Sequence, residues 1–311
     1  METEIFMPYL FLLIANVAGI SKVIAMKNSG KVCPGEYNSV RINTLRSIMC
    51  GLVSLAIFFI AGANAQVEGW WIWLVSGLSN ALMMFLWVVC TQSIGLIYLE
   101  TFSIIGSTAI PMMIAPLLYE GETVSLLQWL GFLCLLIAVV SLSFKPKKER
   151  LLATKSKTFH KFSVMTVVYI LLLILSYVGA GVTQKLYPTL VGKEYTAFFN
   201  LMTFAVVLVC FSSVLIFGKA FKKKSFLPES STSSKKLFIY IFIAAVMIYA
   251  YQYFSTLSAG MLPSAIFYPL IKGVAMLLTA VCDVVIYKQK LTLNKIKGLF
   301  FVFSAILLIN I

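Results

Sequence analysis

Lys272 and Glu100 are charged residues that stand inside apolar stretches of this sequence. Lys272 lies in the apolar run 262–287, shortly after Tyr268 and Pro269. A lysine at the centre of a membrane-spanning helix costs roughly 2.5–3.5 kcal/mol on insertion scales, so it is retained where it faces a cavity or a partner inside the protein. These residue types suit the binding of a small charged molecule, with Lys272 holding an anionic group and Glu100 holding a cationic group or exchanging a proton.

Two other interpretations of this pair stay open. Lys272 and Glu100 could form a structural ion pair, or Lys272 could be held uncharged by burial. Pro269, about one turn before Lys272, removes a helix hydrogen bond and can kink the segment. A broken helix near the middle of the membrane is a frequent feature of transporter binding sites, which favours the substrate-binding interpretation.

Further polar side chains recur in the apolar runs at spacings of three or four residues, which places them on one face of a helix. The run 94–118 has such a stripe, made of Glu100, Ser103, Ser107 and Pro111. Polar residues of membrane helices also bridge neighbouring helices without binding any substrate, and this alternative holds for each of them. The candidate substrate-binding residues are Lys272, Tyr268, Glu100, Ser103, Gln252, Trp87 and Asn16.

The composition excludes several classes of function. Of the 311 residues, 60% are hydrophobic and 12% are charged, against roughly 25% charged in a soluble domain. The net charge of +14 arises from short loops between apolar runs, so membrane orientation explains it better than nucleic-acid binding. The six cysteines show no metal-binding spacing, and His160 is the one histidine. We therefore expect neither an enzyme nor a bound metal or cofactor.

Ten apolar runs of about 20 residues are each long enough to cross a bilayer as a helix. They are 5–26, 40–61, 70–91, 94–118, 125–144, 162–186, 195–217, 237–256, 262–287 and 292–311. The first follows an acidic start, METE, without a basic region or a small-residue cleavage site, which indicates a retained helix and not a signal peptide. The sequence predicts an all-α membrane protein with ten transmembrane helices.

Basic residues are distributed unevenly between the loops. The odd-numbered loops and the adjoining helix ends hold 22 of the 25 lysines and arginines. Because basic loops stay on the cytoplasmic side of a membrane, we expect a multi-pass protein of the cell membrane with both termini outside.

The two halves of the chain resemble each other. Residues 121–136 align with 288–303 at an offset of 167, which places Gly131 on Gly298. The sequence thus predicts a first five-helix repeat, 1–144, a basic cytoplasmic linker, 145–161, and a second five-helix repeat, 162–311. Because five is odd, the second repeat must be inverted, and such repeats place a substrate site near mid-membrane.

A short motif connects this chain to a known family. Gly121 and Glu122 are followed by Gly131, in GETVSLLQWLG, which resembles the "GE…G" signature of the drug/metabolite transporter superfamily, EamA type. Arg46 and Pro111 also match this pattern. The resemblance implies ten helices in two inverted repeats, with the first, third, fourth, sixth, eighth and ninth helices around the substrate cavity.

We expect a secondary transporter that moves small metabolites across the cytoplasmic membrane by alternating access. A cavity that holds both Lys272 and Glu100 suits a zwitterion, so export of amino acids or related amphoteric metabolites is the first hypothesis. The alternatives are a carrier of organic anions or phosphorylated metabolites, and a lipid-intermediate flippase of the same fold. The expected partners are the small-molecule substrate, membrane lipids and a coupling ion such as a proton. No nucleic acid is expected, and the state is a monomer or a homodimer.

Overall fold

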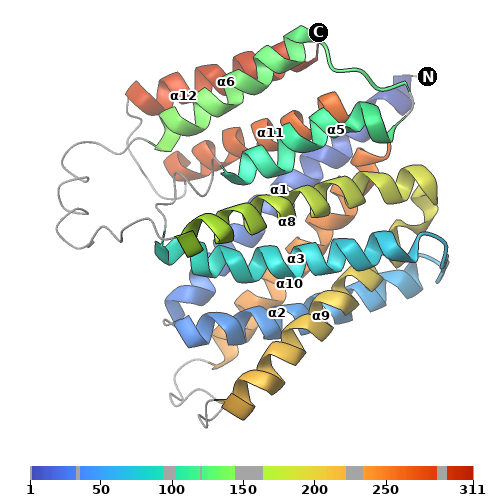
Figure 1. Cartoon of the computed structure of the whole chain (residues 1–311), viewed down its shortest axis with the longest axis vertical. Coiled ribbons are helices and arrows are strands. Elements are labelled where there is room, and N and C mark those ends of the chain that lie inside the picture. Colours follow the sequence, from blue (N-terminus) through green and yellow to red (C-terminus); the bar gives the residue numbers. More distant parts are fainter. Residues whose placement is uncertain are drawn as a thin grey trace. The chain divides into compact units, whose positions relative to one another are not determined.

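The computed structural model describes residues 2–32, 36–93, 102–119, 121–143, 164–221, 234–285 and 293–310, and these residues form helices and turns without any strand (Figure 1). The helices are α1 (Glu2–Val32), α2 (Glu36–Ile60), α3 (Trp70–Ser93), the π-helix η1 (Ile105–Ala109), α5 (Ile110–Leu118), α6 (Leu126–Ser143), α8 (Val164–Leu190), the 3-10 turn η2 (Lys193–Tyr195), α9 (Thr196–Phe221), α10 (Ser234–Ala259), α11 (Ser264–Val285) and α12 (Leu293–Ile309). The prediction of an all-α protein is confirmed for this part of the chain.

Six helices are long and apolar enough to cross a membrane. They contain the segments Phe6–Met26, Ile42–Ile60, Val167–Leu190, Lys193–Val214, Lys235–Ala259 and Ser264–Cys282. The other four predicted spans coincide with shorter apolar helices, Trp70–Leu86, Phe102–Leu118, Leu126–Ser141 and Ile296–Ile309. The structure therefore supports a membrane protein, and the count of ten spans stays a prediction.

Large apolar side chains cover the surface of these helices. Ile60, Leu117 and Val164 are 79%, 85% and 81% exposed, and they belong to a much longer series of exposed leucines, valines and phenylalanines. A helix at a water surface turns a polar face outward, whereas a helix in lipid is apolar on that face too. The exposed surface thus matches a hydrocarbon environment.

The chain forms two compact units. The first unit consists of Met1–Met84 and Gly179–Leu262, and the second unit consists of Phe85–Val178 and Pro263–Ile311. Each unit therefore takes segments from both predicted repeats. Two of the three boundaries fall within α3 and α8, and the third falls between α10 and α11. Since the repeats were inferred from sequence similarity and the units reflect packing, the predicted repeat is left untested by this division.

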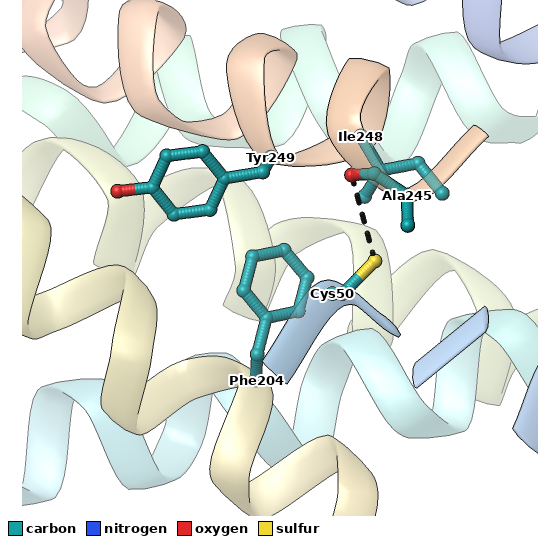
Figure 2. Packing of buried hydrophobic residues seen from close by; sticks show 5 residues of the cluster. All are labelled: Cys50, Phe204, Ala245, Ile248 and Tyr249. Atoms are coloured by element: carbon teal, nitrogen blue, oxygen red, sulfur yellow. Dashed lines mark hydrogen bonds between the residues drawn. The ribbon is translucent and has the colours of Figure 1, made fainter. Parts of the chain in front are cut away.

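In the first unit, α1 packs along α10, and α2 packs against both α9 and α10. Figure 2 shows the contact between α2, α9 and α10, where Cys50 and Phe204 lie against Ala245, Ile248 and Tyr249. The Cys50 thiol donates a hydrogen bond to the Ala245 carbonyl over 3.8 Å. These side chains are at least nine-tenths buried, so they fix the distance between the three helices.

In the second unit, α6 lies along α12, and α11 packs against α12, α5 and α6. The α6–α12 contact contains small residues, including Ala138 and Ala305, which let the two backbones approach. Gly131, the last glycine of the sequence motif, lies at this contact: a Cβ there would be 2.7 Å from Ile309 Cγ1 and 3.0 Å from the Ala305 oxygen. The motif glycine therefore serves helix packing.

Candidate functional site

Helix α11, which carries Lys272, begins at a carboxylate from a distant part of the sequence. The two oxygens of Glu122 accept the backbone N–H of Ser264 at 3.2 and 3.1 Å. The first amides of a helix have no partner within the helix, and negative charge is favourable at that end because of the helix dipole. Glu122 thus caps α11 from the loop before α6, although 142 residues separate it from Ser264.

The loop that holds Glu122 is built on a glycine and a buried tyrosine. Gly121 has φ +79°, a conformation that favours glycine, and it follows α5 closely. Tyr119 is buried and shares a side-chain hydrogen bond with Tyr268 of α11. Burial, together with the nearby Glu122 carboxylate, raises the pKa of Tyr119 above its usual value. Tyr119 therefore stays neutral and keeps the loop bonded to α11.

Lys272 and Tyr268 are four residues apart on α11 and so share one face of the helix. The Lys272 ammonium lies over the ring of Tyr177, on α8, at 5.8 Å from the ring centroid. A cation within about 6 Å of an aromatic face is attracted to it by the ring quadrupole. Lys272 is half-buried and Tyr268 is fully buried. The Lys272 ammonium therefore shares its helix face with one tyrosine and lies over the ring of another, Tyr177.

A π-helical turn packs against the same part of α8. In η1 the amide of Ile110 donates to the carbonyl of Ile105, five residues earlier. A Cβ on Gly106 would be 2.9 Å from the Ile174 oxygen and 2.9 Å from Tyr177 Cβ, so only glycine permits this approach. Single π-helical turns occur often at functional sites. Here the turn fixes the backbone of Tyr177, whose ring faces Lys272.

Polar side chains continue on the segment around η1. Ser103, a predicted site residue, is buried, and its carbonyl accepts the Ser107 hydroxyl at 2.6 Å. The hydroxyl of Thr108 is buried without a hydrogen-bond partner in the described part of the chain. Lys272, Tyr268 and Ser103 thus all belong to the second unit, with Tyr177 as an additional aromatic member.

Two predicted site residues lie in the first unit. Asn16 is buried, and its amide donates to the Leu12 carbonyl at 2.9 Å, while its Oδ1 has no partner among the described residues. The carbonyl of Gln252 accepts Gln184 Nε2 at 3.4 Å and the Thr256 hydroxyl at 2.8 Å. Gln252 therefore helps to join α8 and α10 through its backbone carbonyl, and both interpretations of its side chain stay predictions.

The side chains of the remaining two predicted site residues, Glu100 and Trp87, lie outside the part of the chain that the structure describes. Glu100 lies outside the described residues, so the suggested pair between Lys272 and Glu100 stays a prediction. Trp87 lies in α3, and its side chain is outside the described part.

Sequence reasoning missed several residues of this region. Tyr177 and Tyr119 were not selected, and Glu122 was noted only as part of a motif. In the first unit, Lys185 of α8 was not selected either; it is buried and donates to the Leu262 carbonyl at 2.7 Å. For Glu122 and Lys185 the available signal was a single charged residue beside an apolar run, and that residue bonds a backbone group of its own unit.

The described residues contain no group of three or more histidines, cysteines, aspartates and glutamates that could hold a metal ion. No family model matches the chain, and no curated protein matches it either. A solved structure described only as "Crystal structure of protein" is similar over 97% of this chain and 98% of its own, with a TM-score of 0.64 and 15% sequence identity. At that identity the likeness shows a shared fold and nothing about function.

Proposed function

We propose that this chain is a secondary transporter of small metabolites, of the drug/metabolite transporter type, and that it exports amino acids or related amphoteric metabolites. In this proposal the chain crosses the cell membrane ten times in two inverted repeats, with both termini outside. Alternating access of a site that includes Lys272 moves the substrate, and a proton or another ion supplies the driving force.

The observation that carries the proposal is the setting of Lys272. Its helix is one of the six segments that are long and apolar enough to span a membrane. The helix contains Pro269 one turn before the lysine, and a proline leaves a carbonyl of the preceding turn without its usual partner. A cation beside an aromatic ring in such a helix is suited to binding a carboxylate that carries an apolar side chain.

The proposal is tested by ligand-induced stabilisation of the full chain purified in detergent. The melting midpoint is measured with amino acids, organic acids, sugar phosphates and aromatic amines, on the wild type and on Lys272→Met. A ligand that binds only the folded protein at 100 times its dissociation constant stabilises it by about 2.7 kcal/mol. The matched control is Lys297→Met, because Lys297 is an exposed lysine of the same unit.

We expect an amino acid to raise the midpoint of the wild type and of Lys297→Met, and to leave Lys272→Met unchanged. The same compound should then exchange across liposomes that contain the wild type and not across those that contain Lys272→Met. Stabilisation that is equal in all three proteins would move the site away from Lys272. A grossly unstable Lys272→Met that no compound rescues would favour a structural role.

A second candidate is a carrier of organic anions or phosphorylated metabolites. Among the side chains described in the second unit, the only carboxylate is Glu122, and it is already bonded to the Ser264 amide. The described surroundings of Lys272 thus contain aromatic and hydroxyl groups, and such groups can also hold an anion that has no cationic group. Stabilisation by organic acids or sugar phosphates, and not by amino acids, would select this candidate.

A further inference from the structure

The backbone that carries Lys272 is held in place by close packing. A Cβ on Gly273, the next residue of α11, would be 3.1 Å from Ile306 Cγ1 of α12 and 3.5 Å from Leu135 Cδ2 of α6. All of these residues belong to the second unit, so the contacts fix this part of α11 within it. The lysine side chain is a flexible four-carbon stem, and a fixed backbone therefore leaves several positions open to the ammonium. The groups that contact the ammonium decide between these positions.

The ring of Tyr177 is one of these groups, and it belongs to the same unit. The Lys272 ammonium lies over this ring at 5.8 Å from its centroid, within the distance of about 6 Å at which an aromatic face attracts a cation. Both side chains are only partly buried. Lys272 takes part in a further interaction as well, so the ring is one member of its surroundings.

The position of the Tyr177 ring is restricted more narrowly than that of the lysine. A tyrosine side chain has only two rotatable bonds. A Cβ on Gly106 would be 2.9 Å from the Tyr177 Cβ, so the π-helical turn η1 packs directly against the base of this side chain. A ring that is fixed in this way favours, among the positions open to the lysine, those in which the ammonium lies over its face.

We propose that Tyr177 is a positioning residue for Lys272: the face of its ring holds the ammonium in the place from which it binds the anionic group of the substrate. This inference rests on the function proposed above for Lys272. An ammonium has three N–H donors, and a ring on one side leaves donors on the other sides for the oxygens of a carboxylate or phosphate group. Because the ring face has this role, phenylalanine should replace Tyr177, whereas a side chain without a ring should not.

A tyrosine with only a structural role would behave differently. If Tyr177 did no more than pack α8 against η1, a substitution would lower the stability of the protein and leave the behaviour of Lys272 unchanged. Two measurements on the full chain in detergent separate these roles. One follows the reactivity of Lys272 without any ligand, and the other follows the binding of a small-molecule probe.

The first measurement is the acetylation of Lys272 by a short pulse of acetic anhydride, quantified by peptide mass spectrometry. The exposed Lys297 of the same molecule is the internal reference. The wild type is compared with Tyr177→Phe, Tyr177→Leu and Tyr177→Met. The matched control is Tyr169→Leu, because Tyr169 is a partly buried tyrosine two turns earlier on α8.

We expect the same ratio of Lys272 to Lys297 acetylation in the wild type, Tyr177→Phe and Tyr169→Leu. In Tyr177→Leu and Tyr177→Met the ratio should rise by about 2–30-fold, the factor that corresponds to the loss of a cation–π contact. The reason is that an amine which is no longer held over a ring is more open to the reagent.

The second measurement is the melting midpoint, titrated with alanine as a zwitterionic probe and with succinate as an anionic probe. For a probe that stabilises the wild type, the dissociation constant should increase by about 2–30-fold in Tyr177→Leu and Tyr177→Met. It should stay the same in Tyr177→Phe and in Tyr169→Leu. Equal binding of the probe by the wild type and by a variant without the ring would overturn the proposal.

The acetylation ratio tests the proposal independently of any probe. An unchanged ratio in Tyr177→Leu or Tyr177→Met would overturn it. A raised ratio in Tyr177→Phe would also overturn it, by assigning the role to the hydroxyl, and this result does not require the other variants to fold. If the ratio rises only in the variants without a ring and neither probe stabilises the wild type, Tyr177 positions Lys272, and the proposal of an amino acid or organic acid as the substrate fails.

Discussion

In the second unit the side chains of Glu122 and Tyr119 bond to α11, whereas in the first unit several buried polar atoms have no hydrogen-bond partner among the described residues. Glu122 accepts the Ser264 amide, and Tyr119 bonds Tyr268. The unpartnered atoms of the first unit are Asn16 Oδ1, Arg46 Nε, Trp73 Nε1, Ser76 Oγ, both amide atoms of Asn200, Thr203 Oγ1 and the Tyr249 hydroxyl. In the described second unit they are Thr108 Oγ1 and Ser264 Oγ.

This difference in hydrogen bonding affects how the stability of each unit responds to substitution. A buried polar group without a partner costs about 1–3 kcal/mol, and a satisfied one contributes about 1 kcal/mol. The second unit therefore depends on specific bonds for its stability, and it loses stability when one of them is removed. In the first unit we expect a polar ligand that supplies such bonds to add stability. Four substitutions test this contrast, in decreasing order of expected effect.

Gly106→Ala should have the largest effect. The added Cβ would meet the Ile174 oxygen and Tyr177 Cβ, both at 2.9 Å, and overpacking of this kind costs roughly 1–3 kcal/mol. Gly51→Ala in the first unit is the control, because its Cβ would find only Leu208 Cδ2, at 3.9 Å. Helix propensity predicts that this control is stabilising by about 0.5–1 kcal/mol. Thermal unfolding in detergent measures both, and a stable Gly106→Ala would refute the tight contact between η1 and α8.

Glu122→Ala should cause the second-largest loss of stability. It removes the acceptor of the Ser264 amide and a negative charge at the start of α11, which together are worth about 1–2 kcal/mol. Glu122→Gln keeps an acceptor and should lose about half as much. The exposed Glu194, in the first unit, provides the control substitution Glu194→Gln. If the melting midpoint of Glu122→Ala equals that of the control, Glu122 does not cap α11.

Thr203→Val should act in the opposite direction. Thr203 is buried and its hydroxyl has no partner among the described residues, so an isosteric methyl removes a polar atom without opening a cavity. We expect an unchanged midpoint or a gain of up to about 1 kcal/mol. The control is Thr183→Val, because the Thr183 hydroxyl donates to the Gly179 carbonyl at 2.6 Å. A clear loss in Thr203→Val would mean that this hydroxyl is bonded in solution.

Tyr119→Phe should change the pH dependence of stability in the second unit. Burial and Glu122 raise the pKa of Tyr119 in the folded chain, whereas the unfolded chain releases this proton near pH 10. The contribution of neutral Tyr119 is therefore complete below about pH 10 and falls as the pH rises further. Unfolding midpoints between pH 8 and pH 11 should decline less steeply in Tyr119→Phe than in the exposed-site control Tyr9→Phe. Identical slopes would contradict the burial of a neutral tyrosine beside Glu122.

Much of the fold could be predicted from hydropathy. Each predicted apolar run coincides with an apolar helix as far as the structure describes it, because about 20 apolar residues leave few alternatives to a membrane helix. The shared face of Tyr268 and Lys272 could also be predicted, since it depends only on helical spacing. Orientation and the inverted repeat remain predictions.

The contacts between distant segments could not be predicted. Glu122 caps a helix 142 residues away, and Tyr251 covers Lys22 from another helix. Such pairs depend on which helices become neighbours, and the spacing of residues along one helix does not contain that information. Gly19 and Lys22 both lie against Tyr251, and their spacing of three residues along α1 does not indicate this partner.

The π-helical turn also changes the direction in which the side chains after it point around the helix axis. A regular helix turns by about 100° per residue, so one residue accommodated in a wider turn rotates everything after it by about that angle. Ser103 precedes η1 and Pro111 follows it, so the two no longer share the direction that their spacing of eight residues implies. A deletion of one residue within 105–109 would restore the regular count, and it would aim α5 in a different direction from the one it has now.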